Sequence, residues 1–215
     1  MAPDSNPAAV SFDLFGTLIE TPAVSDYARA IRAELIAHEI AVPTDWDDAF
    51  YEKHIDAPEH AEVPLTDHVY AALQHRGIEP SERDESAIEA AVLDAFDTDV
   101  DVRDGAFEAI RAARTIGPIG VLSNCSVPQL AERSMHRAGL DPARFDAIVT
   151  SVACGWRKPS PQAFYAIAEA LDVRPSGLLH VGDNPDTDGG VADVGGEAVL
   201  LDECGLYELA ERLGR

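Results

Sequence analysis

Several polar side chains of this sequence directly follow or close short apolar runs, and their types suit phosphate and metal chemistry. The third of these runs continues as a Gly/Pro/Asn turn with three acids in six residues, at 183, 186 and 188. A carboxylate at such a place is desolvated unless it meets a cation or several donors. Hard oxygen ligands clustered in this way favour Mg²⁺, whose coordination shell is usually completed by water and by substrate phosphate. The polar residues at the ends of the three apolar runs are Asp13, Ser123 with Asn124, and Asp183.

These side chains need a scaffold that gathers the ends of separate strands, and the hydrophobic pattern predicts one. The apolar run 8–15 ends at Gly16 and Thr17, as a buried strand does before a turn. After Asp101, apolar runs alternate with helical periodicity, which predicts a parallel sheet covered on both faces. Such sheets bind ligands at the carboxyl ends of their strands. The expected strands are 118–123, 145–151, 177–183 and 197–201, and the expected helices are 104–115, 128–138, 160–171 and 205–213.

The segment from about 25 to 96 has a different pattern. Apolar residues recur there at three- and four-residue spacing between prolines, which predicts helices over 26–39, 45–56, 64–76 and 81–97 and no strand. We therefore expect an α/β fold with a doubly wound parallel sheet, formed by residues 1–19 and 101–215. Residues 20–100 would form an α-helical cap inserted after the first strand.

The order of these motifs resembles the haloacid dehalogenase-like superfamily of hydrolases. Each motif alone is also compatible with a simple turn or helix cap, but four of them in this order are specific, and they span the whole predicted core. The motifs are Phe12-Asp13-Leu14-Phe15-Gly16-Thr17-Leu18, Val121-Leu122-Ser123-Asn124, Arg157-Lys158-Pro159, and Val181-Gly182-Asp183 with Asp188.

The resemblance implies a Mg²⁺-dependent phosphohydrolase that acts on a small phosphorylated metabolite. Asp13 would attack phosphorus and form an aspartyl phosphate, activated by metal and lysine rather than by a base. Ser123 would bind the phosphoryl oxygens and Lys158 would neutralise charge beside Asp13, with Thr17 and Asn124 also at the substrate. The implied ligands of Mg²⁺ are Asp13, the backbone carbonyl of Phe15, Asp183 and Asp188.

Phe15 is the departure from the family pattern. Family phosphatases usually carry an Asp at this place that protonates the leaving alkoxide, and general acid help is worth about 10²–10⁴ in rate. Haloacid dehalogenases of the same superfamily have an aromatic residue there, so attack of Asp13 on the carbon of a 2-haloacid is one alternative. Asp183 and Asp188 argue against it, because a metal-free displacement on a carboxylate substrate gains nothing from further carboxylates. The other alternative is a catalytically weak phosphate-binding or regulatory protein.

The composition narrows the partners. With 39 Asp+Glu against 16 Lys+Arg, the net charge is -23, and such a surface repels nucleic acids and anionic lipids. Only two lysines occur, and the acids are spread along the whole chain, which indicates adaptation to high salt. The sequence shows no leader segment, no apolar run of membrane length and no paired cysteine spacing, which predicts a cytoplasmic protein with free thiols.

Substrate choice is expected to belong to the cap, which would close over the strand ends. A period of two puts His180 on the face opposite Asp183, which predicts a packed histidine rather than a catalytic one. Cys125 has no basic neighbour in the sequence, which predicts an inert thiol. The oligomeric state stays open, and a homodimer that pairs through the cap is one arrangement. Cap residues that would face the site, if they are not simply packed, are Tyr27, Trp46, Tyr51, His54, His60 and His68.

Overall fold

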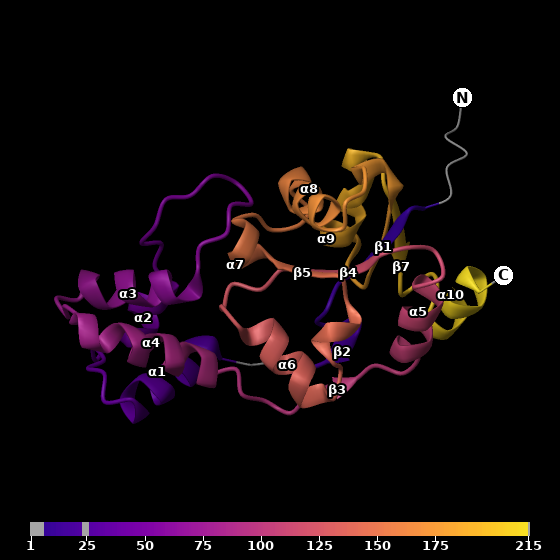
Figure 1. The fold of residues 1–215 in the computed structure, drawn as a ribbon. Coiled ribbons are helices and arrows are strands. Elements are labelled where there is room, and N and C mark those ends of the chain that lie inside the picture. Colours follow the sequence, from indigo (N-terminus) through magenta and orange to yellow (C-terminus); the bar gives the residue numbers. More distant parts are fainter. Residues whose placement is uncertain (1–6, 23–25, 215) are drawn as a thin grey trace.

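Five parallel strands form the central sheet of this computed structural model, which describes residues 7–22 and 26–214 (Figure 1). The strand order is β5-β4-β1-β6-β7. The middle strand β1 (Ala9–Phe12) lies between β4 (Ile119–Ser123) and β6 (Leu178–Gly182). The outer strands are β5 (Ala147–Thr150) and β7 (Glu197–Leu200). All four pairings are parallel, as predicted for a doubly wound α/β fold.

Alternate side chains of the central strand face two different layers of helices. Val10 and Phe12 belong to a core cluster with residues of three helices, and Ala9 belongs to a second cluster with residues of α8. This division follows the period of two along a strand. The first layer consists of α5 (Ala106–Ala113), α6 (Leu130–Ala138) and α10 (Leu206–Leu213), and the second contains α8 (Pro161–Ala170). Short helices α7 (Ser151–Cys154) and α9 (Pro185–Asp188), which the sequence pattern did not predict, follow β5 and β6.

The helical insertion lies beside the sheet rather than over either of its faces (Figure 1). It contains α1 (Tyr27–Ala37), α2 (Trp46–Tyr51), α3 (Leu65–His75) and α4 (Glu82–Asp94). Its two connections to the core carry short strands, β2 (Ile19–Glu20) and β3 (Asp101–Val102), which pair antiparallel. Neither strand was predicted, because two residues are too short to show a period, and both lie outside the segment from about 25 to 96 for which no strand was expected. We propose to keep 20–100 as the boundaries of this subdomain.

Helix α2 is shorter than the sequence predicts. It ends at Tyr51 rather than at 56, since Glu52 adopts an extended conformation and the chain then leaves to contact the core. Ala61 forms a β-bridge with Trp156, and the Glu62 amide donates to the Gly155 carbonyl at 2.9 Å. The chain after α2 thus reaches a distant loop of the core within ten residues of the end of the helix.

The insertion has its own apolar core, which continues into the sheet domain. Ile31, Leu35, Trp46 and Leu73 are buried within it. The same cluster includes three core residues that follow β4, namely Cys125, Val127 and Leu130, and Phe15 packs against it as well as against the main core. The two parts therefore share one packed contact next to the carboxyl ends of β1 and β4.

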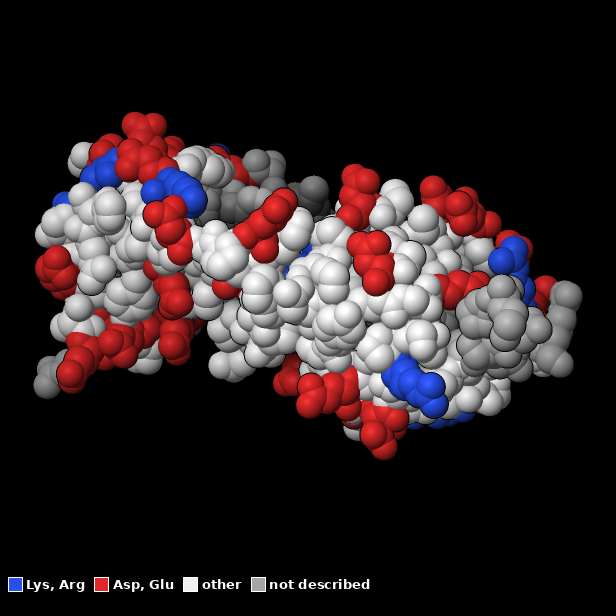
Figure 2. All heavy atoms as spheres, turned by 90° about the horizontal axis from the view of Figure 1, so that it is seen from above, with Lys and Arg blue, Asp and Glu red and all other residues white. Residues whose placement is uncertain are grey.

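Acidic side chains prevail over basic ones on the face seen in Figure 2, over both the insertion and the sheet domain. This agrees with the formal net charge of -23. Within the part of the chain that the structure describes, no helix has the length and the apolar character needed to cross a membrane.

Candidate active site

The carboxyl ends of the three central strands bring the predicted site residues to one edge of the sheet. Phe12, the last residue of β1, is level with Val121 of β4 and with Val181 of β6. Asp13 follows β1, and its amide donates to the Val181 carbonyl at 2.8 Å. Ser123 is the buried last residue of β4, and Asp183 follows β6 directly. Parallel pairing in this register therefore groups residues that are far apart in the sequence.

Lys158 is the centre of this group. Its ammonium nitrogen Nζ lies 2.7 Å from Oδ1 of Asp13 and 2.6 Å from Oδ1 of Asp188. The side chains of Lys158 and Asp188 are each 1% exposed, and that of Asp13 is 10% exposed. One buried cation thus links the predicted nucleophile to an acid of the turn after β6.

Asn124 holds the backbone of Lys158 on both sides. Its carbonyl oxygen Oδ1 accepts from the Lys158 amide at 2.8 Å, and its nitrogen Nδ2 donates to the Lys158 carbonyl at 3.0 Å. The sequence analysis assigned Asn124 to substrate binding, but the structure commits its amide group to positioning Lys158. The spacing of 34 residues between the two gives no local signal of this contact.

Burial and charge set the protonation of Asp13 and Lys158. Burial raises the pKa of Asp13 to about 6, against the opposing effect of the Lys158 charge. Burial by itself would lower the pKa of Lys158, but the charges of Asp13 and Asp188 outweigh it and the net pKa is raised. Lys158 is therefore a permanent cation beside the carboxylate.

His180 is a buried hydrogen-bond partner of Asp188. Its Nε2 lies 3.1 Å from Oδ1 of Asp188, and its Nδ1 lies 2.8 Å from the Ser11 hydroxyl. Burial lowers the pKa of His180 to about 4, so the ring is neutral and donates from Nε2 to the carboxylate. It is packed edge-on against Phe164, as predicted, yet the sequence analysis missed its contact with Asp188.

Both carboxylate oxygens of Asp188 are in contact with protein donors. Burial would raise its pKa, but the His180 hydrogen bond and the Lys158 charge outweigh burial and hold the pKa below its usual range. Its second oxygen, Oδ2, accepts from the Asn184 amide at 3.0 Å. These contacts fit a residue that holds Lys158 better than the direct Mg²⁺ ligand that the sequence suggested.

Asp183 is exposed and lies against the turn that follows Asp13. The Thr17 hydroxyl donates to its Oδ1 at 3.2 Å. Gly16, at a φ of +86°, leaves room for this carboxylate, because a Cβ there would lie 2.6 Å from Oδ2. Thr17, predicted to contact the substrate, is fully buried and instead orients Asp183.

The predicted acids do not form a closed metal cage. Among the described residues, the group of three with ligand atoms within 4.8 Å of one another is Glu34, His38 and Asp94, in the insertion. There Asp94 also pairs with Arg133 at 3.0 Å. Asp13 and Asp183 nevertheless offer hard carboxylate oxygens at the same sheet edge, a donor set that suits Mg²⁺.

A group of hydrogen bonds between the insertion and the core lies next to Lys158, and it was not predicted from the sequence. The His60 carbonyl accepts from the Arg157 amide at 2.8 Å. The Ser151 hydroxyl donates to the Glu62 carboxylate and accepts from the Cys125 amide at 2.8 Å. His60 is one of the cap residues that were expected to face the site. In this contact its backbone carbonyl, not its imidazole, binds the residue before Lys158.

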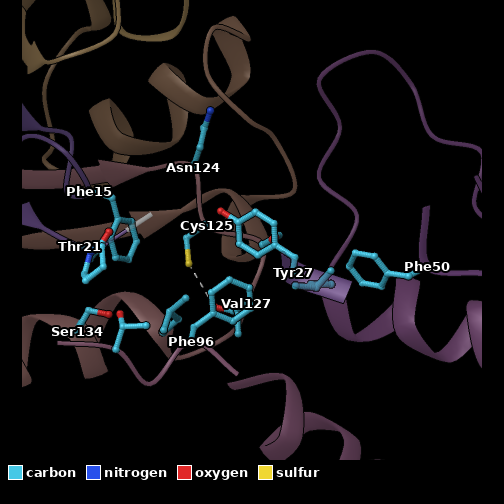
Figure 3. A pocket seen from close by; sticks show the side chains of 14 residues that line it. Phe15, Thr21, Tyr27, Phe50, Phe96, Asn124, Cys125, Val127 and Ser134 are labelled. Atoms are coloured by element: carbon cyan, nitrogen blue, oxygen red, sulfur yellow. Dashed lines mark hydrogen bonds between the residues drawn. The ribbon is translucent and has the colours of Figure 1, made fainter. Parts of the chain in front are cut away.

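A pocket of about 460 Å³ opens between the insertion and the strand ends (Figure 3). Phe15 and Asn124 line it on the core side, and Tyr27 and Phe50 line it on the insertion side. Cys125 also lines it, and burial raises the pKa of its thiol to about 11, as expected for an inert thiol. The pocket therefore adjoins the site through Phe15, two residues after Asp13, and through Asn124, which is hydrogen-bonded to the Lys158 backbone.

Comparison with known proteins gives matches along most of the chain. The family model of the haloacid dehalogenase-like hydrolases matches residues 7–194. A segment of 98 residues is 36% identical to Phosphatase MT3486 of Mycobacterium tuberculosis (strain CDC 1551 / Oshkosh), and covers 45% of this chain and 45% of that protein. The matched segments span less than half the length of the curated relatives.

Solved structures of two activities share the fold. A HAD phosphatase from Thermococcus onnurineus is 19% identical with a TM-score of 0.60, over 96% of this chain and 97% of that one. A 2-haloacid dehalogenase from Pseudomonas syringae pv. Tomato DC3000 is 23% identical with a TM-score of 0.62, over 90% and 86%. The family match, with the four motifs meeting at one sheet edge, shows that this chain belongs to the haloacid dehalogenase-like hydrolases and is a hydrolase.

Proposed function

We propose that this hydrolase is a Mg²⁺-dependent phosphohydrolase that cleaves a small phosphorylated metabolite through an aspartyl phosphate at Asp13. The observation that carries this proposal is the buried Lys158, held at 2.7 Å from Asp13 by a second carboxylate and by Asn124. A fixed cation beside a carboxylate nucleophile is suited to phosphoryl oxygens, whose negative charge it neutralises.

The exposed Asp183 favours phosphate over other electrophiles. Asp13, Asp183 and the backbone carbonyl of Phe15 would hold Mg²⁺, which would supply charge neutralisation for the phosphoryl oxygens. In this revised assignment Asp188 keeps Lys158 in place rather than serving as a ligand, because its oxygens already accept from Lys158, His180 and Asn184.

The chemistry proceeds in two displacements. A carboxylate oxygen of Asp13 forms a bond to phosphorus while the ester P–O bond breaks, and the leaving oxygen departs with the bonding electron pair. Water then attacks phosphorus, the P–O bond to Asp13 breaks, and the carboxylate, inorganic phosphate and a proton result. Lys158 and Ser123 donate to the phosphoryl oxygens in both steps.

Dehalogenation is the competing function because structural neighbours of that activity exist and Phe15 replaces the acid. A 2-haloacid would place its own carboxylate beside the anionic Asp13 and Asp183. The buried Asp13 and the exposed Asp183 around one anionic substrate are unfavourable without a metal. Asp183 therefore supports phosphotransfer.

The test is covalent labelling with ³²P-labelled acetyl phosphate, which has a good leaving group. With Mg²⁺, wild-type protein should retain acid-stable label that hydroxylamine removes, and Asp13→Asn should retain none. Chloride release from 2-chloropropionate without Mg²⁺, together with no labelling, would replace the phosphatase assignment with the dehalogenase one.

A further inference from the structure

The pocket beside Asp13 is lined mainly by aromatic and aliphatic side chains. Phe15 contributes from the turn after β1, and Tyr27, Phe50 and Phe96 contribute from the insertion (Figure 3). Tyr27 and Phe96 are in contact, with ring centroids 5.6 Å apart. A volume of about 460 Å³ is within the range of small-molecule sites. The group that enters this space meets rings on several sides.

The pocket excludes charge. No described lining residue is acidic, basic or a histidine, although charged residues make up 26% of the chain. A carboxylate or second phosphate placed here would lose water and gain no ionic partner, which is costly. The lining therefore selects against sugar acids, haloacids and bisphosphates.

Phe15 adds a second, chemical argument. The described lining residues include no carboxyl or imidazole group, the usual donors of a proton to a leaving oxygen. An alkoxide leaves poorly without a proton, whereas a phenol has a pKa of about 10, like that of a tyrosine, and its oxygen departs as the anion. The apolar lining and the missing proton donor thus point to the same leaving group.

We infer that the substrate is the phosphate monoester of an uncharged phenol, whose ring occupies this pocket while its phosphate lies at Asp13 and Lys158. This inference rests on the proposed phosphohydrolase function and specifies its leaving group. Attack by Asp13 releases the aryl oxide with its electron pair, and solvent water protonates the oxide.

The test compares phenyl phosphate with 3-carboxyphenyl phosphate, whose leaving groups are of nearly equal basicity. Chemical reactivity then cancels, and kcat/KM reports the pocket. We expect phenyl phosphate to be preferred by roughly tenfold or more, since the carboxylate is desolvated without a partner. Tyr27→Arg, at a site that is 45% exposed, should remove or reverse the preference. A separate variant, Thr98→Lys, repeats this test because it places a cation at another residue of the pocket lining, on the other connection of the insertion.

Tyr207→Arg is the matched control, because Tyr207 is also exposed, at 58%, but lies on α10 away from this pocket. It should keep the wild-type preference. The substrate inference is overturned if wild type turns over the two esters equally, or the carboxylated one faster. In that case phosphate release that depends on Asp13 would still support the phosphatase function. No phosphate release from either ester would overturn both.

Discussion

Replacing Asp188 by Asn tests whether this acid positions Lys158 or binds Mg²⁺. The substitution keeps the shape of the side chain and removes one charge from the pair with Lys158, whose Nζ lies 2.6 Å away in a fully buried setting. A buried hydrogen bond to a charged group is worth about 1.5–3 kcal/mol, which corresponds to a loss of roughly 10- to 150-fold in rate. We therefore expect kcat to fall by this factor.

The assay is phosphate release from phenyl phosphate over a series of Mg²⁺ concentrations. For Asp188→Asn, the Mg²⁺ concentration at half-maximal rate should stay at the wild-type value, because the carboxylate oxygens are already occupied by protein donors. Asp183→Asn should raise that concentration. Asp186→Asn, an exposed acid of the same turn, is the control and should change neither quantity.

A positioning role of Asp188 is refuted if Asp188→Asn raises the Mg²⁺ requirement as much as Asp183→Asn does and high Mg²⁺ restores its kcat. Asp188 would then be a metal ligand, as the motif alone suggested. Circular dichroism of each variant shows that a loss of rate is not a loss of fold.

Three further outcomes follow from the same structure. Asn124→Ala removes two hydrogen bonds to the Lys158 backbone, of 2.8 and 3.0 Å, and should lower kcat by roughly 10- to 100-fold at about 1 kcal/mol each; an unchanged kcat in steady-state assays would exclude a positioning role. Phe15→Asp should raise kcat for alkyl phosphates by up to about 10²–10⁴ and change that for phenyl phosphate little, and a similar gain for both esters would contradict the missing-proton argument. Repulsion among the 39 acids should make Tm rise with KCl, since the Debye length shrinks to about 3 Å at 1 M salt; a melting temperature that is flat from low to multimolar KCl would contradict salt adaptation.

The sequence by itself determined the strands and the residues that end them. Short apolar runs, separated by segments of helical periodicity, predicted the parallel sheet, and the structure contains strands within each of the predicted ranges. Asp13, Ser123 and Asp183 therefore had to lie at one edge, because parallel strands end on the same side. A packed His180 was predicted from the period of two along its strand, and the ring is buried against Phe164. These properties depend on side chains a few residues apart, so they are visible without a structure.

Only the tertiary structure decided which of these side chains are bound by other protein groups and which are left exposed for a ligand. Lys158 meets Asp13 across 145 positions of sequence and Asn124 across 34, and no local pattern reports such distances. Asp188 turned toward Lys158 and His180 rather than toward Asp183, because α9 carries it into the buried side of the sheet edge. The contact of the chain after α2 with the core, from Glu62 to Gly155, was also beyond the reach of the local pattern. The uncharged pocket arose where the insertion and the strand ends meet, so its lining is a product of packing between segments that are separate in the chain.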